Sequence, residues 1–115
     1  MSFLDEYPIV SIVNPCITFT GNSIPQDASK FWYEQILLIE EKVKSWDQIE
    51  AIFKFDYYNS STLHFLTRIL KILEEEATKK KVKVYWYYLE TDTDMLESGE
   101  DYKTSLKLDI KLLKR

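Results

Sequence analysis

Apolar and polar residues alternate with a period of two in several stretches of the chain, and this pattern predicts β-strands. Two strands are expected within residues 8–24, and one each at 49–58, 82–89 and 106–113. Asn14-Pro15 lies between the first two and predicts a β-hairpin. In the third strand, the alternation assigns Phe55 and Tyr57 to the core face and Tyr58 to the opposite face.

Between the strands the apolar period lengthens to that of a helix. The first helix is expected at residues 27–45, followed by Trp46, with one apolar stripe: Trp32, Ile36, Ile39, Val43 and Trp46. The second is expected at residues 61–79, with its own apolar face: Leu66, Ile69, Leu70, Leu73 and Ala77. The polar stretch 90–104 predicts a short third helix interrupted at Gly99, because glycine is a poor helix former.

The order of these elements, β-β-α-β-α-β-α-β, predicts an α/β domain with a single mixed sheet and right-handed crossovers. A parallel sheet that is covered on both faces would have almost continuously apolar strands. These strands instead keep one polar side, so both long helices are expected on the other face; the polar side includes Lys54, Lys83 and Lys107. Three tyrosines are expected on the open face: Tyr58, Tyr85 and Tyr87. They would form a partner-binding surface or lie scattered among the charges.

The composition narrows the possible partners. A chain of 115 residues is expected to fold as one domain, residues 1–115. The net charge of −4 argues against a nucleic-acid partner, which would require a basic surface. Cys16 is the only cysteine and cannot form an internal disulfide. Because no signal peptide or membrane-spanning apolar run is recognised, we expect a cytoplasmic protein with no membrane partner.

The chain has few of the residue patterns that catalysis or a cofactor requires. His64 is the only histidine, and it lies four residues after Ser60 on the same predicted helix, a poor position for activating Ser60 or Cys16 as a nucleophile. Two glycines cannot supply a glycine-rich phosphate loop. The acidic stretch 90–101 lacks the glycine at the sixth position and the correctly placed bidentate glutamate of a calcium loop. We therefore expect no enzyme, no metal site and no cofactor.

The most informative stretch is residues 53–62, where a strand passes directly into a helix at Asn59 and three hydroxyl residues follow, Ser60, Ser61 and Thr62. A helix N-terminus leaves backbone N–H groups unpaired and carries partial positive charge, which suits a phosphoryl group on one of these hydroxyls. The simpler interpretation is that Ser60 or Ser61 caps the helix. The abrupt change of period at Asn59 predicts that Ser60 is accessible to solvent.

Three motifs carry a resemblance to a known family. They are residues 21–25 (Gly-Asn-Ser-Ile-Pro), residues 55–62 (Phe-Asp-Tyr-Tyr-Asn-Ser-Ser-Thr) and residues 86–102, where Trp-Tyr-Tyr is followed by a spaced acidic pattern ending in Gly-Glu-Asp-Tyr. In this order and spacing, the chain resembles the SiaC-type regulatory phosphoproteins of bacteria. The third motif is the most specific, and none of the three is a catalytic signature.

The resemblance implies the fold of anti-sigma-factor antagonists, which is also found in the tail domains of sulfate transporters (STAS-like). It implies phosphorylation of the hydroxyl residue after the motif's asparagine, here Ser60, in a turn formed with Asn59, Ser61 and Thr62. It also implies a dedicated kinase, a PP2C-type phosphatase and, as a target of the unphosphorylated form, a diguanylate cyclase. The family commonly has threonine where this chain has Ser60, which keeps the hydroxyl. Leu63-His64 also departs from the family pattern. This departure bears on which kinase modifies the chain more than on whether Ser60 is phosphorylated.

Two other functions remain open on the sequence. The first is a constitutive interaction or dimerisation module that uses the tyrosines of the open face. The second is a small-ligand-binding domain that holds an anion at the turn of Ser60, Ser61 and Thr62. Neither of these would be modified by a cognate kinase.

Overall fold

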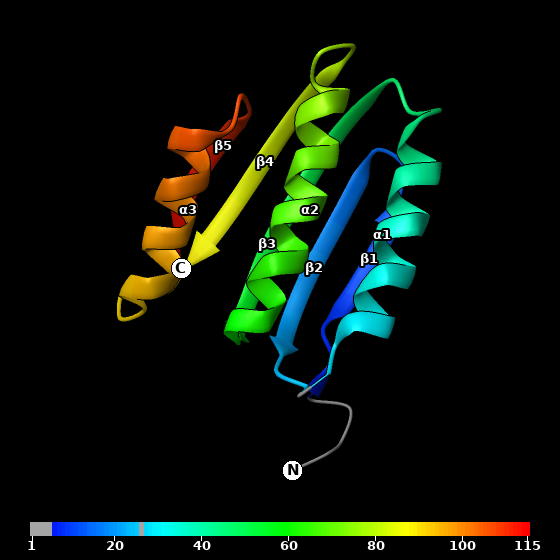
Figure 1. The fold of residues 1–115 in the computed structure, drawn as a ribbon. Coiled ribbons are helices and arrows are strands. Elements are labelled where there is room, and N and C mark those ends of the chain that lie inside the picture. The colour runs from blue at the N-terminus through cyan, green and yellow to red at the C-terminus, as the bar shows by residue number, and fades with distance from the viewer. Residues whose placement is uncertain (1–5, 26) are drawn as a thin grey trace.

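The computed structural model describes residues 6–25 and 27–115. Five strands and three helices follow one another in the predicted order (Figure 1). Their bounds are β1 (Ile9–Val13), β2 (Cys16–Ser23), α1 (Ser29–Val43), β3 (Gln48–Tyr58), α2 (Ser60–Glu76), β4 (Lys81–Tyr88), α3 (Thr93–Ser105) and β5 (Asp109–Lys114). The prediction of an α/β domain with one mixed sheet is confirmed.

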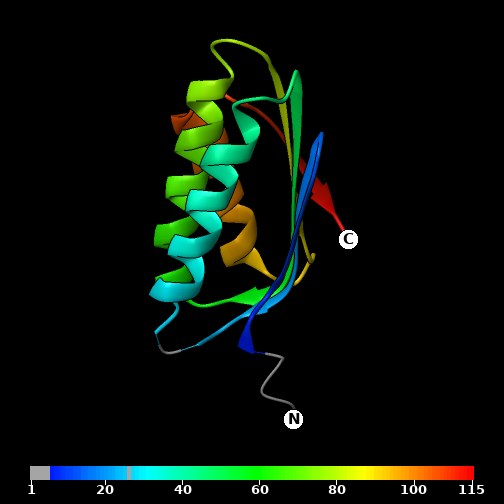
Figure 2. The same cartoon turned by 90° about the vertical axis from the view of Figure 1, so that its right-hand side faces the viewer.

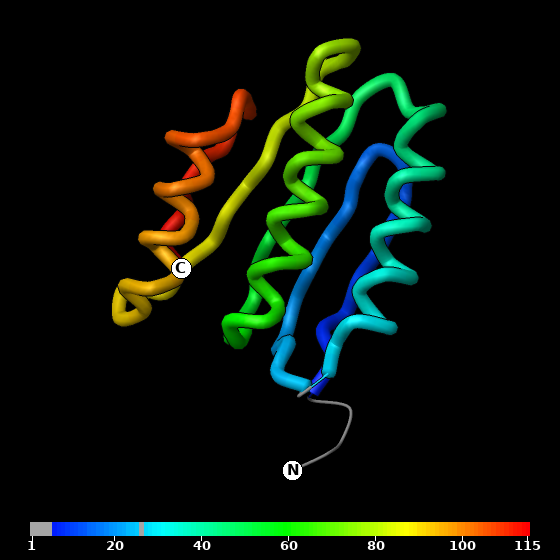
Figure 3. Tube along the Cα trace, in the orientation of Figure 1, coloured from blue at the N-terminus to red at the C-terminus, as the bar shows by residue number. Residues whose placement is uncertain are grey.

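The strands lie in the sheet in chain order, from β1 at one edge to β5 at the other (Figure 3). β1 and β2 form the antiparallel hairpin predicted at Asn14-Pro15, and the other neighbours are parallel. The carboxyl ends of β2, β3 and β4 therefore lie at one edge of the sheet, where all three helices begin (Figure 1). In open α/β sheets ligands commonly bind outside the carboxyl ends of the strands.

All three helices lie on one side of the sheet, and no described segment covers the other side (Figure 2). The apolar stripe predicted for α1 is buried against the sheet over its whole length. The largest fully buried side chains are aromatic and come from α1 and three strands: Trp32, Trp86, Phe19, Phe53 and Phe55. The prediction of two long helices on one face is confirmed, and none of the helices in the described ranges has the length and apolar character needed to cross a bilayer.

The predicted interruption at Gly99 is wrong, because α3 continues through this residue. Gly99 is buried, and a Cβ atom placed on it would lie 2.5 Å from Cδ1 of Trp86. The indole Nε1 of Trp86 donates a hydrogen bond to the carbonyl oxygen of Met95 in α3 at 2.9 Å. The glycine therefore allows α3 to approach the indole of β4 closely instead of ending the helix.

The predicted position of Lys107 on the open face is also wrong. Lys107 precedes β5, which begins at Asp109, and its backbone N–H donates to the Glu74 carboxylate of α2 at 2.7 Å. Lys54 does lie on the open face as predicted, with its Nζ 5.1 Å from the centre of the Tyr87 ring.

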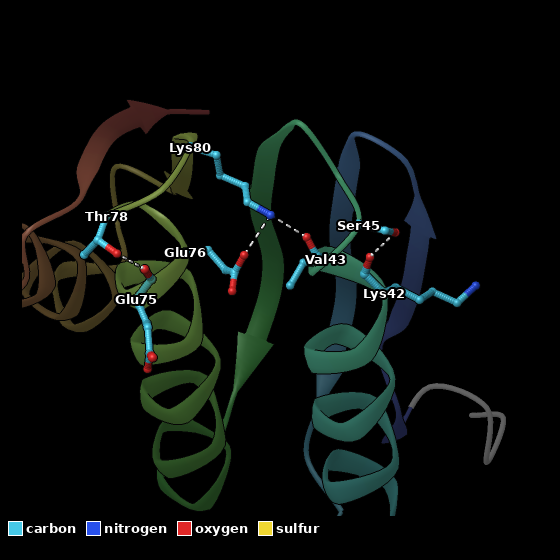
Figure 4. A network of polar contacts seen from close by, with 7 residues as sticks. All are labelled: Lys42, Val43, Ser45, Glu75, Glu76, Thr78 and Lys80. Atoms are coloured by element: carbon cyan, nitrogen blue, oxygen red, sulfur yellow. Dashed lines mark hydrogen bonds and ion pairs between the residues drawn. The ribbon is translucent and has the colours of Figure 1, made fainter.

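The Lys80 side chain joins the C-terminal ends of the two long helices (Figure 4). Lys80 Nζ lies 2.8 Å from Glu76 Oε1 and also donates to the Val43 carbonyl oxygen of α1 at 2.8 Å. The Lys80 and Glu76 side chains are each only 10% exposed. The ammonium group thus satisfies a buried carboxylate and a carbonyl at the C-terminal end of α1.

Candidate functional site

Asn59 caps the helix that starts at the predicted strand–helix joint. Its backbone is extended, and its Oδ1 accepts a hydrogen bond from the Thr62 N–H at 3.1 Å. The Ser61 hydroxyl donates to the same Oδ1 at 2.8 Å. The interpretation of Ser60 or Ser61 as the cap is therefore wrong, because the Asn59 side chain before them already occupies the capping position.

Thr62 is fully buried and belongs to a polar network beneath the turn. Its Oγ1 lies 2.7 Å from the Ser23 Oγ and 3.1 Å from the Ser23 carbonyl oxygen. The Trp32 indole N–H donates to the Ser23 Oγ at 3.2 Å. The network joins α1, β2 and α2, so the Thr62 hydroxyl holds the start of the helix in place and is shielded from solvent.

Ser60 is the remaining hydroxyl, and the prediction that it is accessible is confirmed. It is the first residue of α2, its side chain is exposed, and its hydroxyl has no hydrogen-bond partner among the described residues. The first N–H groups of a helix have no intrahelical partner and carry partial positive charge. Of the three hydroxyls, only Ser60 is both free and placed where this charge would act on an attached anion.

An open pocket of about 420 Å³ lies beside Ser60, between the starts of α2 and α3. Its lining combines apolar, hydroxyl and acidic side chains: Tyr57, Tyr58, Asn59, Ser60, Leu63, Asp92, Asp94, Met95 and Ser98. Asp92 caps α3 through the Met95 N–H, at 3.0 Å from its Oδ1. The carboxylates of Asp92 and Asp94 make the α3 side of Ser60 negative. Within the described residues, no three acidic, His or Cys side chains are grouped as a metal site.

Tyr58 does not lie on the open face, so its predicted position there is wrong. Its ring packs on the helix side of the sheet, edge-on to Phe55 at 5.7 Å and to Trp86 at 6.3 Å between ring centres. Burial raises the pKa of Tyr58 to about 12, and the nearby Ser98 hydroxyl offsets only part of this rise. The Tyr58 hydroxyl is buried and makes no hydrogen bond of good geometry to any described residue.

A β-bulge explains the reversal. Gly21 of β2 pairs with Phe55, but the next residue, Asn22, pairs with Tyr57, so Asp56 is an extra residue in β3. The Arg115 guanidinium holds this bulge, donating to the Phe55 carbonyl oxygen at 3.0 Å and to the Asp56 carboxylate at 3.1 Å. Beyond the bulge, each side chain lies on the face opposite to the one that strict alternation assigns.

The open face therefore carries Tyr85 and Tyr87, as predicted, with Tyr57 in place of Tyr58. Tyr85 pairs in register with Ile52 and Lys111, and it alternates with the buried Val84 and Trp86. Tyr57 is 54% exposed and was missed by the alternation. A glycine inside a strand often marks a bulge, so Gly21 is the sequence signal that could have indicated the exposure of Tyr57. In the structure Gly21 has a φ of 86°, which glycine adopts readily.

Comparison with known proteins identifies relatives of this arrangement. The model of the family described as SiaC family regulatory phosphoprotein matches residues 9–115. A search of curated protein sequences gave no match. A chain in the crystal structure of the diguanylate cyclase SiaD in complex with its activator SiaC, from Pseudomonas aeruginosa, superposes with a TM-score of 0.85 at 17% identity, covering 96% of this chain and 94% of that one. Apo-SiaC from the same organism gives a TM-score of 0.82 at 18% identity, covering 95% and 92%. At these identities, the two structures establish the fold.

Proposed function

Because the chain belongs to the SiaC family of regulatory phosphoproteins, we propose that it is a partner switch controlled by phosphorylation of Ser60. It is a regulator and not an enzyme. A cognate protein kinase transfers a phosphoryl group to the Ser60 hydroxyl, and a PP2C-type phosphatase removes it. The unphosphorylated form binds and regulates a target such as a diguanylate cyclase.

The observation that carries this proposal is the difference between the three hydroxyls at the start of α2. Thr62 is buried in the network with Ser23, and Ser61 donates to the capping Asn59. Ser60 alone is exposed and unpaired at the helix N-terminus. A kinase that approaches this turn meets two exposed hydroxyls, and only that of Ser60 does not already donate a hydrogen bond.

Charge supplies the mechanism of switching. A phosphoryl group on Ser60 brings about −1.5 to −2 charges to a turn where unpaired backbone N–H groups can receive it. The rest of the molecule need not refold. A bound partner would cover this anion and remove it from water, which costs several kcal/mol unless the partner supplies a counter-charge. Phosphorylation therefore weakens binding at a surface that includes Ser60.

The relatives support the choice of target. SiaC from Pseudomonas aeruginosa is an activator that is found in complex with a diguanylate cyclase, and its fold spans nearly the whole of this chain. The open sheet face gives the chain a second possible contact surface, with Tyr85 and Tyr87 as partner-binding residues. Tyr58, whose ring is packed inside, contributes there only by supporting the sheet.

Calorimetric titration of Ser60 variants with the target cyclase tests the proposal. Ser60→Ala should bind with the affinity of the unphosphorylated wild type, because it keeps the turn neutral. Ser60→Asp should bind about tenfold more weakly or worse, although one carboxylate charge mimics the phosphoryl group only in part. Equal affinities for the two variants would rule out charge at position 60 as the switch.

Thermal unfolding of the same variants is the control. An acidic residue at a helix N-terminus stabilises the folded protein by about 0.3–1 kcal/mol. The Tm of Ser60→Asp should therefore stay close to that of the wild type or rise slightly. A large fall in Tm would mean that Ser60 has a structural role in the turn, and the loss of binding would then reflect unfolding.

A further inference from the structure

The exposed side of α2 near Ser60 carries cations and no carboxylates. Ser60, His64, Arg68 and Lys71 are all exposed, and their spacing of four, four and three residues places them along one side of the helix. The first exposed carboxylate of α2 is Glu75, four turns after Ser60. In a chain with a net charge of −4, this three-turn stretch is locally basic.

Exposed apolar side chains lie next to these cations on α1. Tyr33 is 45% exposed and Leu37, one turn later, is 66% exposed. The Arg68 guanidinium carbon lies 5.2 Å from the centre of the Tyr33 ring, and the same ring meets Phe65 edge-on at 5.4 Å. Tyr33 is thus held between the two helices by contacts to α2, which lowers the entropy that it would lose in contacting a partner.

We propose that this α1–α2 surface, formed by Tyr33, Leu37, His64, Arg68 and Lys71, binds an amphipathic helix of the target whose apolar stripe is bordered by acidic residues on the side that faces α2. The inference rests on the proposed function and specifies the chemistry of its partner. Tyr33 and Leu37, one turn apart, match the spacing of apolar side chains along a docked helix. Arg68 and Lys71 supply the charges that complement carboxylates on this border, whereas the exposed Glu34, Glu40 and Glu41 of α1 would face the other border.

This surface also accounts for the direction of the switch. Ser60 lies one turn before His64 on the same side of α2, so a phosphoryl group there would stand about 5–6 Å from the His64 position. Partner carboxylates drawn to Arg68 and Lys71 would then meet an added dianion at the end of the surface. On the other side of Ser60, the carboxylates of Asp92 and Asp94 limit the surface to α1 and α2.

The test uses two synthetic helical peptides that share a leucine face and differ in carrying glutamate or lysine along one border of that face. Backbone amide resonances of the unphosphorylated chain are followed during titration. The glutamate peptide should shift the resonances of Tyr33, Leu37 and Arg68, and the lysine peptide should bind at least fivefold more weakly. Three outcomes would overturn the proposal: equal binding of both peptides, no binding of the glutamate peptide, or shifts confined to Tyr85 and Tyr87 on the open sheet face.

Charge reversal provides the matched comparison. Arg68→Glu should weaken binding of the glutamate peptide by about five- to tenfold, and Arg68→Lys should retain most of it. Lys103→Glu makes the same change at an exposed position of α3 and should leave affinity within twofold of wild type. Equal affinity of Arg68→Glu and Lys103→Glu would contradict the proposal. No kinase takes part in this titration, so its result does not depend on whether Ser60 is phosphorylated. A failure of the phosphorylation proposed above would be detected by the separate kinase experiment.

Discussion

Replacing Lys80 by methionine is expected to lower the free energy of unfolding by about 3 kcal/mol. The substitution leaves the Glu76 carboxylate without its cation and the Val43 carbonyl oxygen without its donor, in a site where both charged side chains are only 10% exposed. Removing one partner of a buried pair costs about 3–5 kcal/mol, and the small remaining exposure places this pair at the lower end. Urea denaturation followed by tryptophan fluorescence measures the change.

Two further variants separate the ion pair from other effects of the substitution. Lys79→Met changes the neighbouring exposed lysine and should cost less than about 0.5 kcal/mol. The double variant Glu76→Met with Lys80→Met removes both charges and should recover much of the loss, because no unpaired carboxylate remains. If Lys80→Met were as stable as Lys79→Met, the pair would behave as an ordinary surface contact.

Gly99→Ala should destabilise the protein by about 1–3 kcal/mol, although alanine is the better helix former by about 1 kcal/mol. The new Cβ would lie 2.5 Å from Trp86 Cδ1 and 2.7 Å from Leu112 Cδ2. The indole cannot easily move away, since its N–H donates to Met95 and its ring packs against Phe53 at 5.4 Å. The same denaturation experiment measures the loss, and the tryptophan emission of the folded protein, to which Trp86 contributes, should change with it.

Glu100→Ala is the matched control for Gly99→Ala, because it makes a substitution to alanine at the next, exposed position of α3. It should change the free energy of unfolding by less than about 0.5 kcal/mol. A Gly99→Ala protein with wild-type stability or better would show that α3 can shift away from the sheet at little cost.

The sequence was sufficient for the elements whose pattern depends on local periodicity. The α1 stripe and the alternation in β4 each have a strong period, and their burial follows it residue by residue. The bulge in β3 depends instead on distant partners. Gly21 lies in another strand, and Arg115 reaches the Phe55 carbonyl oxygen across 60 positions of sequence. A period-two pattern carries no information about an inserted residue, so Tyr57 and Tyr58 were assigned to the wrong faces.

Gly99 illustrates a second limit. Its weak helix propensity predicts an interruption, whereas in the fold its missing side chain makes room for Trp86. Whether a glycine ends a helix or allows close packing depends on what lies opposite, and local sequence does not contain that partner. Lys107 was misplaced for a related reason, because β5 begins two residues after it and its N–H pairs with α2.

The candidate site was predictable in position and less so in detail. The change of period at Asn59 located the turn and the exposure of Ser60. The roles of its neighbours depend on tertiary contacts: Asn59 caps the helix, and Thr62 is buried against Ser23, which lies 39 positions away. The kinase, the phosphatase and the cyclase followed from the family resemblance and not from any residue pattern alone.

Mapping the phosphoryl group after reaction with the cognate kinase and ATP tests the central claim most directly. Intact mass and fragment spectra should show one phosphoryl group, on Ser60, in the wild type and in Ser61→Ala, and none in Ser60→Ala. The phosphorylated wild type should then lose its affinity for the target and regain it after treatment with the PP2C-type phosphatase. A phosphoryl group on Ser61 or Thr62, or undiminished binding by the protein phosphorylated on Ser60, would contradict the account.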